Sequence, residues 1–234
     1  MEESQIKSLR IAIVGCGNVA THFALGLDRV GICPVGIYGR DPLTVARLAE
    51  SLSAPSSLMC GDLSEVASSA ADVVIVSVAD RAIADVAAAI GPLPVGTVVL
   101  HTSGTVGMEL LSSVSADHGI LYPLQTFSRN VPVDLSEVPF FTEASTEAAL
   151  AVADGLASVL SEHVVHADAS RRRALHIAGV LSCNFPNYLL ECAGKVLADA
   201  GFGLDVVAPL VRTTIAKAFD VGPHDAQTGP ARRG

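Results

Sequence analysis

A short apolar run that leads straight into a glycine-rich turn constrains the fold of this chain more than any other feature. Residues 11–14 read Ile-Ala-Ile-Val, which predicts a buried strand, and the pattern Gly15-x-Gly17-x-x-Ala20 follows at once. Gly15 permits the tight turn, Gly17 lets a ligand approach the backbone, and Ala20 keeps the next helix close to the sheet. We expect the free N–H groups at the helix start, at Asn18 and Val19, to face the diphosphate of a dinucleotide. Glycine pairs after strands also form plain turns. Because this pair lies in the first strand-turn-helix unit of the chain, a dinucleotide site is the favoured interpretation.

Strand and helix patterns then alternate in the manner of a parallel sheet with helical crossovers. The pattern predicts helices from the glycine turn to residue 31 and over residues 42–52, 81–90 and 147–160. Strands are predicted at residues 11–14, 34–38, 57–60, 71–78, 97–101, 119–122, 139–142 and 163–165. The fold class that follows is α/β, a doubly wound Rossmann-like sheet.

The composition changes near residue 167, where the strand pattern stops. Residues 170–200 form one long helical stretch, apolar almost all round, which we expect to be buried on most sides against a neighbour. Pro186 should kink this helix after Phe185, and a second helix is predicted over residues 206–220. The chain is thus predicted to hold a Rossmann-like dinucleotide-binding domain over residues 1–166 and a smaller all-α domain over residues 167–234.

The net charge and the cysteine content limit which classes of ligand and site this chain is expected to have. With a net charge of -9 and a pI near 5.1, the chain should not attract nucleic acid or anionic membranes, so a small molecule is the expected partner. The polar N-terminus lacks a signal-peptide core and no apolar run approaches the ~20 residues of a bilayer span, which predicts a cytoplasmic protein. The five cysteines are scattered, and His163 and His166 fall on opposite faces of a strand, so no metal site is expected.

Arg40 indicates which dinucleotide binds. It follows the second predicted strand, where an acidic residue would receive the ribose 2′-hydroxyl of NAD and an arginine accommodates the 2′-phosphate of NADP. NADP is therefore the expected cofactor. Two alternatives stay open: Arg40 could be a solvated surface residue paired with Asp41, or Asp41 itself could bind the ribose of NAD.

Loops after the fourth and fifth predicted strands should border the nicotinamide, because ligands of open α/β sheets lie beyond the carboxyl ends of the strands. Val78 and Ala79 are expected to contact the cofactor there. His101 could donate a proton to a reduced carbonyl or imine, and Ser103 could orient the substrate by hydrogen bonding. In the alternative interpretation His101 caps the strand end and Ser103 forms a turn.

A second candidate site lies on the long helix. Arg172 and His176 are four residues apart and share a face, and Asn184 is rotated by about 80° from His176. Polar groups on an apolar helix need partners, which could be a substrate in an interdomain cleft or a satisfied buried network. His101, Ser103, His176 and Asn184 are the catalytic candidates.

Several segments together resemble a bacterial family that joins a Rossmann-like domain to a C-terminal domain of unknown function. They are the glycine loop, His101-Thr-Ser-Gly104, Tyr122-Pro-Leu-Gln-Thr-Phe-Ser128, residues 176–184 with Ser182, and Thr228-Gly-Pro-Ala-Arg-Arg233. The Rossmann part is similar to pyrroline-5-carboxylate reductase and to deazaflavin-dependent NADP oxidoreductases. The resemblance implies that residues 122–128 form a loop at the cleft, that His176, Ser182 and Asn184 line it, and that the C-terminal helices mediate a homodimer. Members of the family continue beyond the Thr-Gly-Pro segment, so the C-terminal domain is expected to be truncated here.

The favoured function is an NADP-dependent oxidoreductase that reduces a small carbonyl or imine, with His101 or His176 supplying a proton. The alternative is a non-catalytic NADP-binding sensor or regulatory protein, which the lack of an unambiguous acid, base or nucleophile favours. A third hypothesis is electron exchange between NADP and a deazaflavin.

Overall fold

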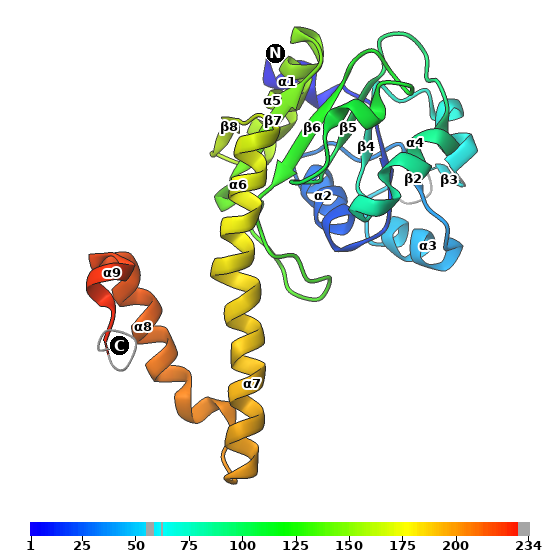
Figure 1. Ribbon diagram of the computed structural model, residues 1–234. Helices are drawn as coiled ribbons and strands as arrows, with labels where there is room; N and C mark the ends of the chain where they lie inside the picture. The colour runs from blue at the N-terminus through cyan, green and yellow to red at the C-terminus, as the bar shows by residue number, and fades with distance from the viewer. Residues whose placement is uncertain (55–58, 62, 229–234) are drawn as a thin grey trace. The chain divides into compact units, whose positions relative to one another are not determined.

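One mixed sheet organises the first part of the chain. The computed structural model describes residues 1–54, 59–61 and 63–228, and in them an eight-stranded sheet runs in the order β3-β2-β1-β4-β5-β6-β7-β8 (Figure 1). Neighbouring strands are parallel except β6 and β7. The strands are β1 (Ile11–Val14), β2 (Gly36–Tyr38), β3 (Met59–Gly61), β4 (Val73–Val76), β5 (Val98–His101), β6 (His118–Pro123), β7 (Phe140–Ala144) and β8 (Val164–His166). This confirms the predicted Rossmann-like sheet.

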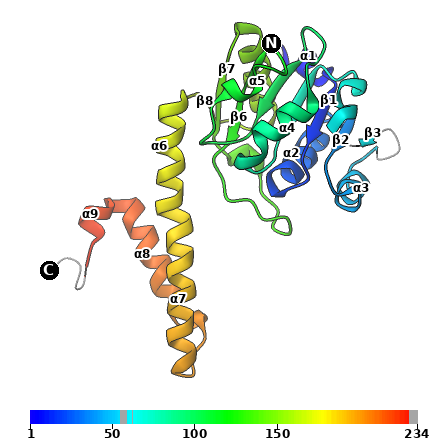
Figure 2. The ribbon, with the colours of Figure 1, turned by 45° about the vertical axis from the view of Figure 1, so that its right-hand side comes forward.

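Helices connect the parallel strands and cover both faces of the sheet (Figure 2). The α-helices of the first unit are α1 (Glu3–Lys7), α2 (Asn18–Arg29), α3 (Pro42–Glu50), α4 (Ile83–Ile90), α5 (Glu147–Leu160) and α6 (Ala169–Gly179), and those of a second unit at the C-terminal end are α7 (Phe185–Asp199), α8 (Ala208–Val221) and α9 (Pro223–Ala226). Short α1 and α9 were not predicted, and α4 begins two residues later than expected because residues 80–82 form a 3-10 turn. Residues 57 and 58 of the strand predicted at 57–60, and residues 229–234 of the C-terminal segment, lie outside the described residues.

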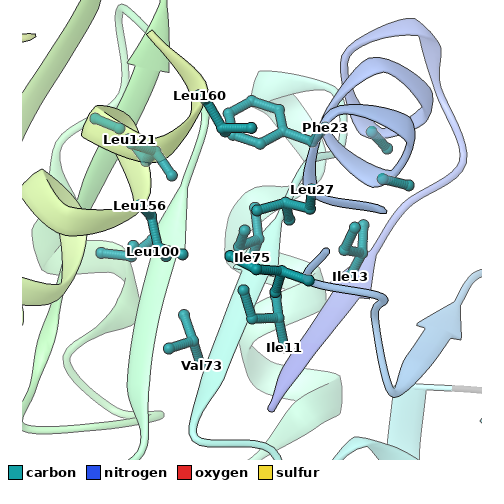
Figure 3. Packing of buried hydrophobic residues seen from close by; sticks show 14 of the residues in the cluster. Ile11, Ile13, Phe23, Leu27, Val73, Ile75, Leu100, Leu121, Leu156 and Leu160 are labelled. Atoms are coloured by element: carbon teal, nitrogen blue, oxygen red, sulfur yellow. The ribbon is translucent and has the colours of Figure 1, made fainter. Parts of the chain in front are cut away.

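The apolar strands are buried on both faces, as a sheet covered by two helical layers requires. Successive side chains of β1 point to opposite faces. Ile13 lies in one core cluster with Leu27 of α2 and Leu156 of α5, which Figure 3 shows from close by. The next residue, Val14, belongs to a second cluster that includes Ile83 of α4. Both clusters fix the strands so that β1, β2, β4 and β5 end at the same edge.

The chain divides into two compact units, Met1–Gly179 and Val180–Gly234. The predicted boundary between residues 166 and 167 lies before α6, whereas α6 belongs to the first unit. Arg172 explains this, since its buried guanidinium donates hydrogen bonds to the carboxylate of Glu143 on β7 and to the carbonyl oxygen of Ala167. A buried charge held in this way ties α6 to the sheet.

The long helical stretch that leads into the second unit is less buried than the sequence predicted. Residues 170–200 were expected to be buried on most sides, yet within the single chain Arg172 is the one buried residue of α6 and no residue of the π-helical turn or α7 is buried. The interruption predicted at Pro186 takes the form of a π-helical turn over residues 180–184, immediately before α7. Proline has no N–H to donate four residues back, and a wider turn accommodates its ring. Among the helices that the structure describes, none combines the length and the apolar character needed to span a bilayer.

Candidate functional site

The glycine turn brings the start of α2 against the end of β4. Gly15 has a φ of 116°, and a Cβ atom there would overlap the carbonyl oxygen of Ser77, so only glycine fits. Gly17 precedes the first helical residue and has open space on the side where a Cβ would point. Ala20 is fully buried and packs in the core, which matches the packing role expected for it. The turn thus leaves the first backbone N–H groups of α2 accessible to a ligand.

A cavity of about 990 Å³ lies along this edge of the sheet. Residues that follow β1, β2, β4 and β5 line it, together with part of the segment after β6. Among the predicted site residues, the cavity is lined by Gly15, Gly17, Asn18, Val19, Arg40, Val78, Ala79 and Ser103. A volume of this size can hold a dinucleotide-sized ligand in part or whole.

Three other predicted site residues of the first unit, Ala20, His101 and His176, are not among the lining residues. His176 is half-buried on α6. Asn184, the fourth, belongs to the second unit, where its side chain is exposed and does not cap α7. The structure therefore brings together Ser103 and the cofactor candidates other than Ala20, whereas His176 of the same unit does not line this cavity.

Arg40 and Asp41 stand side by side in the sequence but have different partners. The carboxylate of Asp41 caps α3, where it accepts hydrogen bonds from the hydroxyl of Thr44 and from the N–H of Leu43, the latter at 3.1 Å. The hydroxyl of Thr44 is the main cause that lowers the pKa of Asp41. In the described part of the chain Arg40 is exposed and forms no ion pair with Asp41 or any other carboxylate. Asp41 is thus engaged in capping, while the guanidinium of Arg40 is free to meet an anion in the cavity.

His101 is fully buried at the end of β5, and both of its ring nitrogens are used. Nδ1 accepts the N–H of Ser103 at 3.1 Å, which leaves Nε2 to carry the proton and donate to the carbonyl oxygen of Gly107 at 3.2 Å. Burial lowers the pKa of His101 to about 4, so the ring is neutral near pH 7. This geometry supports the alternative interpretation, in which His101 holds the strand end and the turn that carries Ser103.

Ser103 has a hydroxyl whose hydrogen-bonding direction can be deduced. Its Oγ accepts the N–H groups of Thr105 at 3.2 Å and Val106 at 3.1 Å. The hydroxyl of Thr105 donates its only proton to Asp80 at 2.5 Å, so the proton between Ser103 and Thr105, whose oxygens are 3.5 Å apart, must belong to Ser103. A contact of that length is weak. Among the described residues, the hydroxyl proton of Ser103, a residue that lines the cavity, therefore has only this weak acceptor.

Several lining residues were not predicted as site residues. Asp80 and Arg81 follow β4, and Gln125 and Phe127 come from the segment after β6. The sequence held a usable signal for Asp80 and Arg81, because they are polar side chains that directly follow a central strand. Only the family resemblance pointed to the second pair, because their approach to the glycine turn depends on contacts such as the hydrogen bond from Asn18 to the carbonyl oxygen of Phe127, 2.9 Å long. The described residues hold no cluster of three potential metal ligands.

Comparison with protein families and solved structures places this geometry in context. Residues 1–126 match the Rossmann-like domain, and residues 138–234 match the domain of unknown function DUF2520. No curated protein matches the chain.

Solved structures share the fold over most of its length. BF3122 from Bacteroides fragilis, named a "putative NADP oxidoreductase", is 35% identical with a TM-score of 0.89, and the match covers 97% of this chain and 87% of that one. TM1727 from Thermotoga maritima is 22% identical with a TM-score of 0.77, over 96% and 85% of the two chains. A pyrroline-5-carboxylate reductase from Coxiella burnetii is 16% identical with a TM-score of 0.60, over 94% and 82%. The chain therefore belongs to the family that joins a Rossmann-like domain to the DUF2520 domain.

Proposed function

We propose that the protein is an NADP-dependent oxidoreductase that reduces a small carbonyl or imine compound. The observation that carries this proposal is the cavity at the carboxyl ends of β1, β2, β4 and β5, which has an accessible helix start at one place and, at another, Arg40, with which no carboxylate of the described residues pairs. A diphosphate suits the first and a 2′-phosphate suits the second. The name of BF3122, 35% identical, supports the same reaction class.

The donor set fits NADP in its chemistry. The N–H groups at the start of α2, at Asn18 and Val19, would hold the diphosphate, and Arg40 would hold the 2′-phosphate. Val78 and Ala79 would border the nicotinamide. The bound cofactor would supply a hydride.

Ser103 is the residue that we assign to the substrate. Its oxygen accepts two backbone N–H groups, so its proton is available to a carbonyl oxygen or an imine nitrogen. Donation at that atom would stabilise the charge that develops as the bond is reduced. His101 positions Ser103 by accepting its N–H. His176, which does not line the cavity, and Asn184, which belongs to the second unit, stay predictions.

Oxidation of NADPH, followed by its absorbance against a panel of keto acids and cyclic imines, tests the function. We expect at least one compound to be reduced, and Ser103→Ala to lower kcat/KM for it about 100-fold while NADPH binding stays within about twofold. Ser112→Ala, a change at an exposed serine outside the cavity, is the matched control and should leave both values unchanged. A protein that binds NADPH tightly but is silent with every compound would contradict the reductase and favour the sensor.

We also propose a homodimer formed through the C-terminal helices. Large apolar side chains of α7 and α8 are exposed in the single chain: Phe185, Tyr188, Leu189, Val196, Leu210, Ile215, Phe219 and Val221. Exposed apolar residues gathered on one unit typically mark an interface. Light scattering should give the mass of two chains, and Leu189→Glu combined with Leu210→Glu should give that of one. A wild-type protein that is monomeric at micromolar concentration would contradict the dimer.

A further inference from the structure

The segment after β6 folds back onto the glycine turn, although more than a hundred residues separate the two in the sequence. Asn18 donates to the carbonyl oxygen of Phe127, and His22 lies 3.2 Å from the carbonyl oxygen of Ser128. The rings of His22 and Phe127 are also in contact, with centroids 5.1 Å apart. A third bond comes from the guanidinium of Arg129, which donates to the carbonyl oxygen of Cys16.

The last of these bonds fixes a positive charge beside the phosphate site. Cys16 is the residue between Gly15 and Gly17, so the guanidinium of Arg129 is held at the turn from which the first N–H groups of α2 emerge. That bond uses one of the five N–H donors of the guanidinium. In the described residues Arg129 is exposed and no carboxylate pairs with it. Arg129 lies at the rim rather than among the lining residues, but Cys16, which it contacts, and Phe127, two residues before it, both line the cavity.

The glycine turn needs such a charge from elsewhere. The first turn of α2, residues 18–21, contains no lysine or arginine, so its own attraction for a diphosphate rests on backbone N–H groups and the helix dipole. Arg40 follows β2, at the place expected for the 2′-phosphate rather than the diphosphate. A guanidinium can donate two parallel hydrogen bonds to phosphate oxygens, which makes Arg129 the matching partner for the diphosphate.

We propose that Arg129 is a cofactor-binding residue that contacts the diphosphate of the dinucleotide while its hydrogen bond to Cys16 keeps the loop in place. This inference rests on the proposed function, because it requires that an adenine dinucleotide binds in this cavity. It adds a binding residue that belongs to neither the glycine motif nor the second strand.

Calorimetry with two ligands tests this assignment. NADP⁺ carries a diphosphate, whereas adenosine 2′-monophosphate carries only the phosphate expected at Arg40. Arg129→Gln should weaken NADP⁺ binding by about 10-fold or more and leave binding of adenosine 2′-monophosphate within about twofold. Arg129→Lys, which keeps the charge but not the fork, should recover part of the loss.

His22→Phe is the matched control for a purely structural role. It removes the contact with Ser128 and keeps a ring against Phe127, but it changes no group near the diphosphate. It should bind NADP⁺ within about threefold of the wild type. Equal loss in His22→Phe and Arg129→Gln, or an Arg129→Gln protein that binds NADP⁺ normally, would overturn the role of Arg129 and leave the proposed function standing. A wild-type protein that binds neither ligand would overturn both.

Discussion

Replacing Arg40 by glutamine is expected to weaken NADPH binding by about 10- to 100-fold and to leave NADH binding within about twofold. The 2′-phosphate is the group that distinguishes the two cofactors. A hydrogen bond to a charged group contributes about 1.5–3 kcal/mol, which corresponds to that range in affinity. Because no carboxylate of the described residues pairs with Arg40, the substitution removes a contact to the ligand without releasing a partner inside the protein.

Arg47→Gln is the matched control, since Arg47 is an exposed arginine on the neighbouring α3 that does not line the cavity. It should bind both cofactors as the wild type does. Titration calorimetry at neutral pH measures the affinities of the wild type and both variants for both cofactors. The salt concentration is held fixed, because salt screens exposed charges. Equal weakening of NADPH and NADH in Arg40→Gln would contradict a contact with the 2′-phosphate.

Acid is expected to destabilise the first unit through His101. The unfolded chain takes up a proton at this histidine near pH 6.5, whereas the folded chain resists protonation down to a pKa of about 4 because the ring is buried. The stability that depends on a neutral His101 is therefore full above pH 6.5 and is lost as the pH falls from about 6.5 to about 4. Linkage gives a loss of about 2 kcal/mol between pH 7 and pH 5 from this residue alone.

Denaturant unfolding at pH 7 and pH 5 measures this loss in the wild type and in His101→Gln. The difference between the two pH values is compared within each protein, so the cost of the substitution itself cancels. The wild type should lose about 2 kcal/mol more than His101→Gln. His163→Gln, at an exposed histidine, should behave as the wild type does. An identical loss in all three proteins would show that His101 is not kept neutral by burial.

Much of the fold could be predicted because it follows from local patterns. The apolar run at residues 11–14 and the spacing of Gly15 and Gly17 specify a buried strand and the turn after it. Regular alternation then predicts a parallel sheet with helices on both faces. The strand predicted at residues 57–60 had the weakest apolar pattern of the predicted strands. The prediction that α7 is buried was wrong for the single chain. An apolar pattern indicates that a helix packs against a partner, but it does not say whether the partner belongs to the same chain.

Site chemistry was harder to predict, because it depends on which polar atoms meet. The sequence placed His101 and Ser103 at the end of a strand, but only the structure shows that one ring nitrogen of His101 holds Ser103 and the other faces Gly107. The sequence left Asp41 open as a ribose ligand, and the structure engages it as the cap of α3.

By itself, the amino-acid sequence determined the strand-turn-helix unit, the doubly covered sheet and the position of Arg40 after the second strand. The tertiary structure alone decided that His101 is enclosed and that a distant loop brings Arg129 to Cys16. The physical reason is that periodicity records the burial of each element along the chain, whereas a hydrogen bond between distant residues forms only after the core clusters have fixed the elements that carry them.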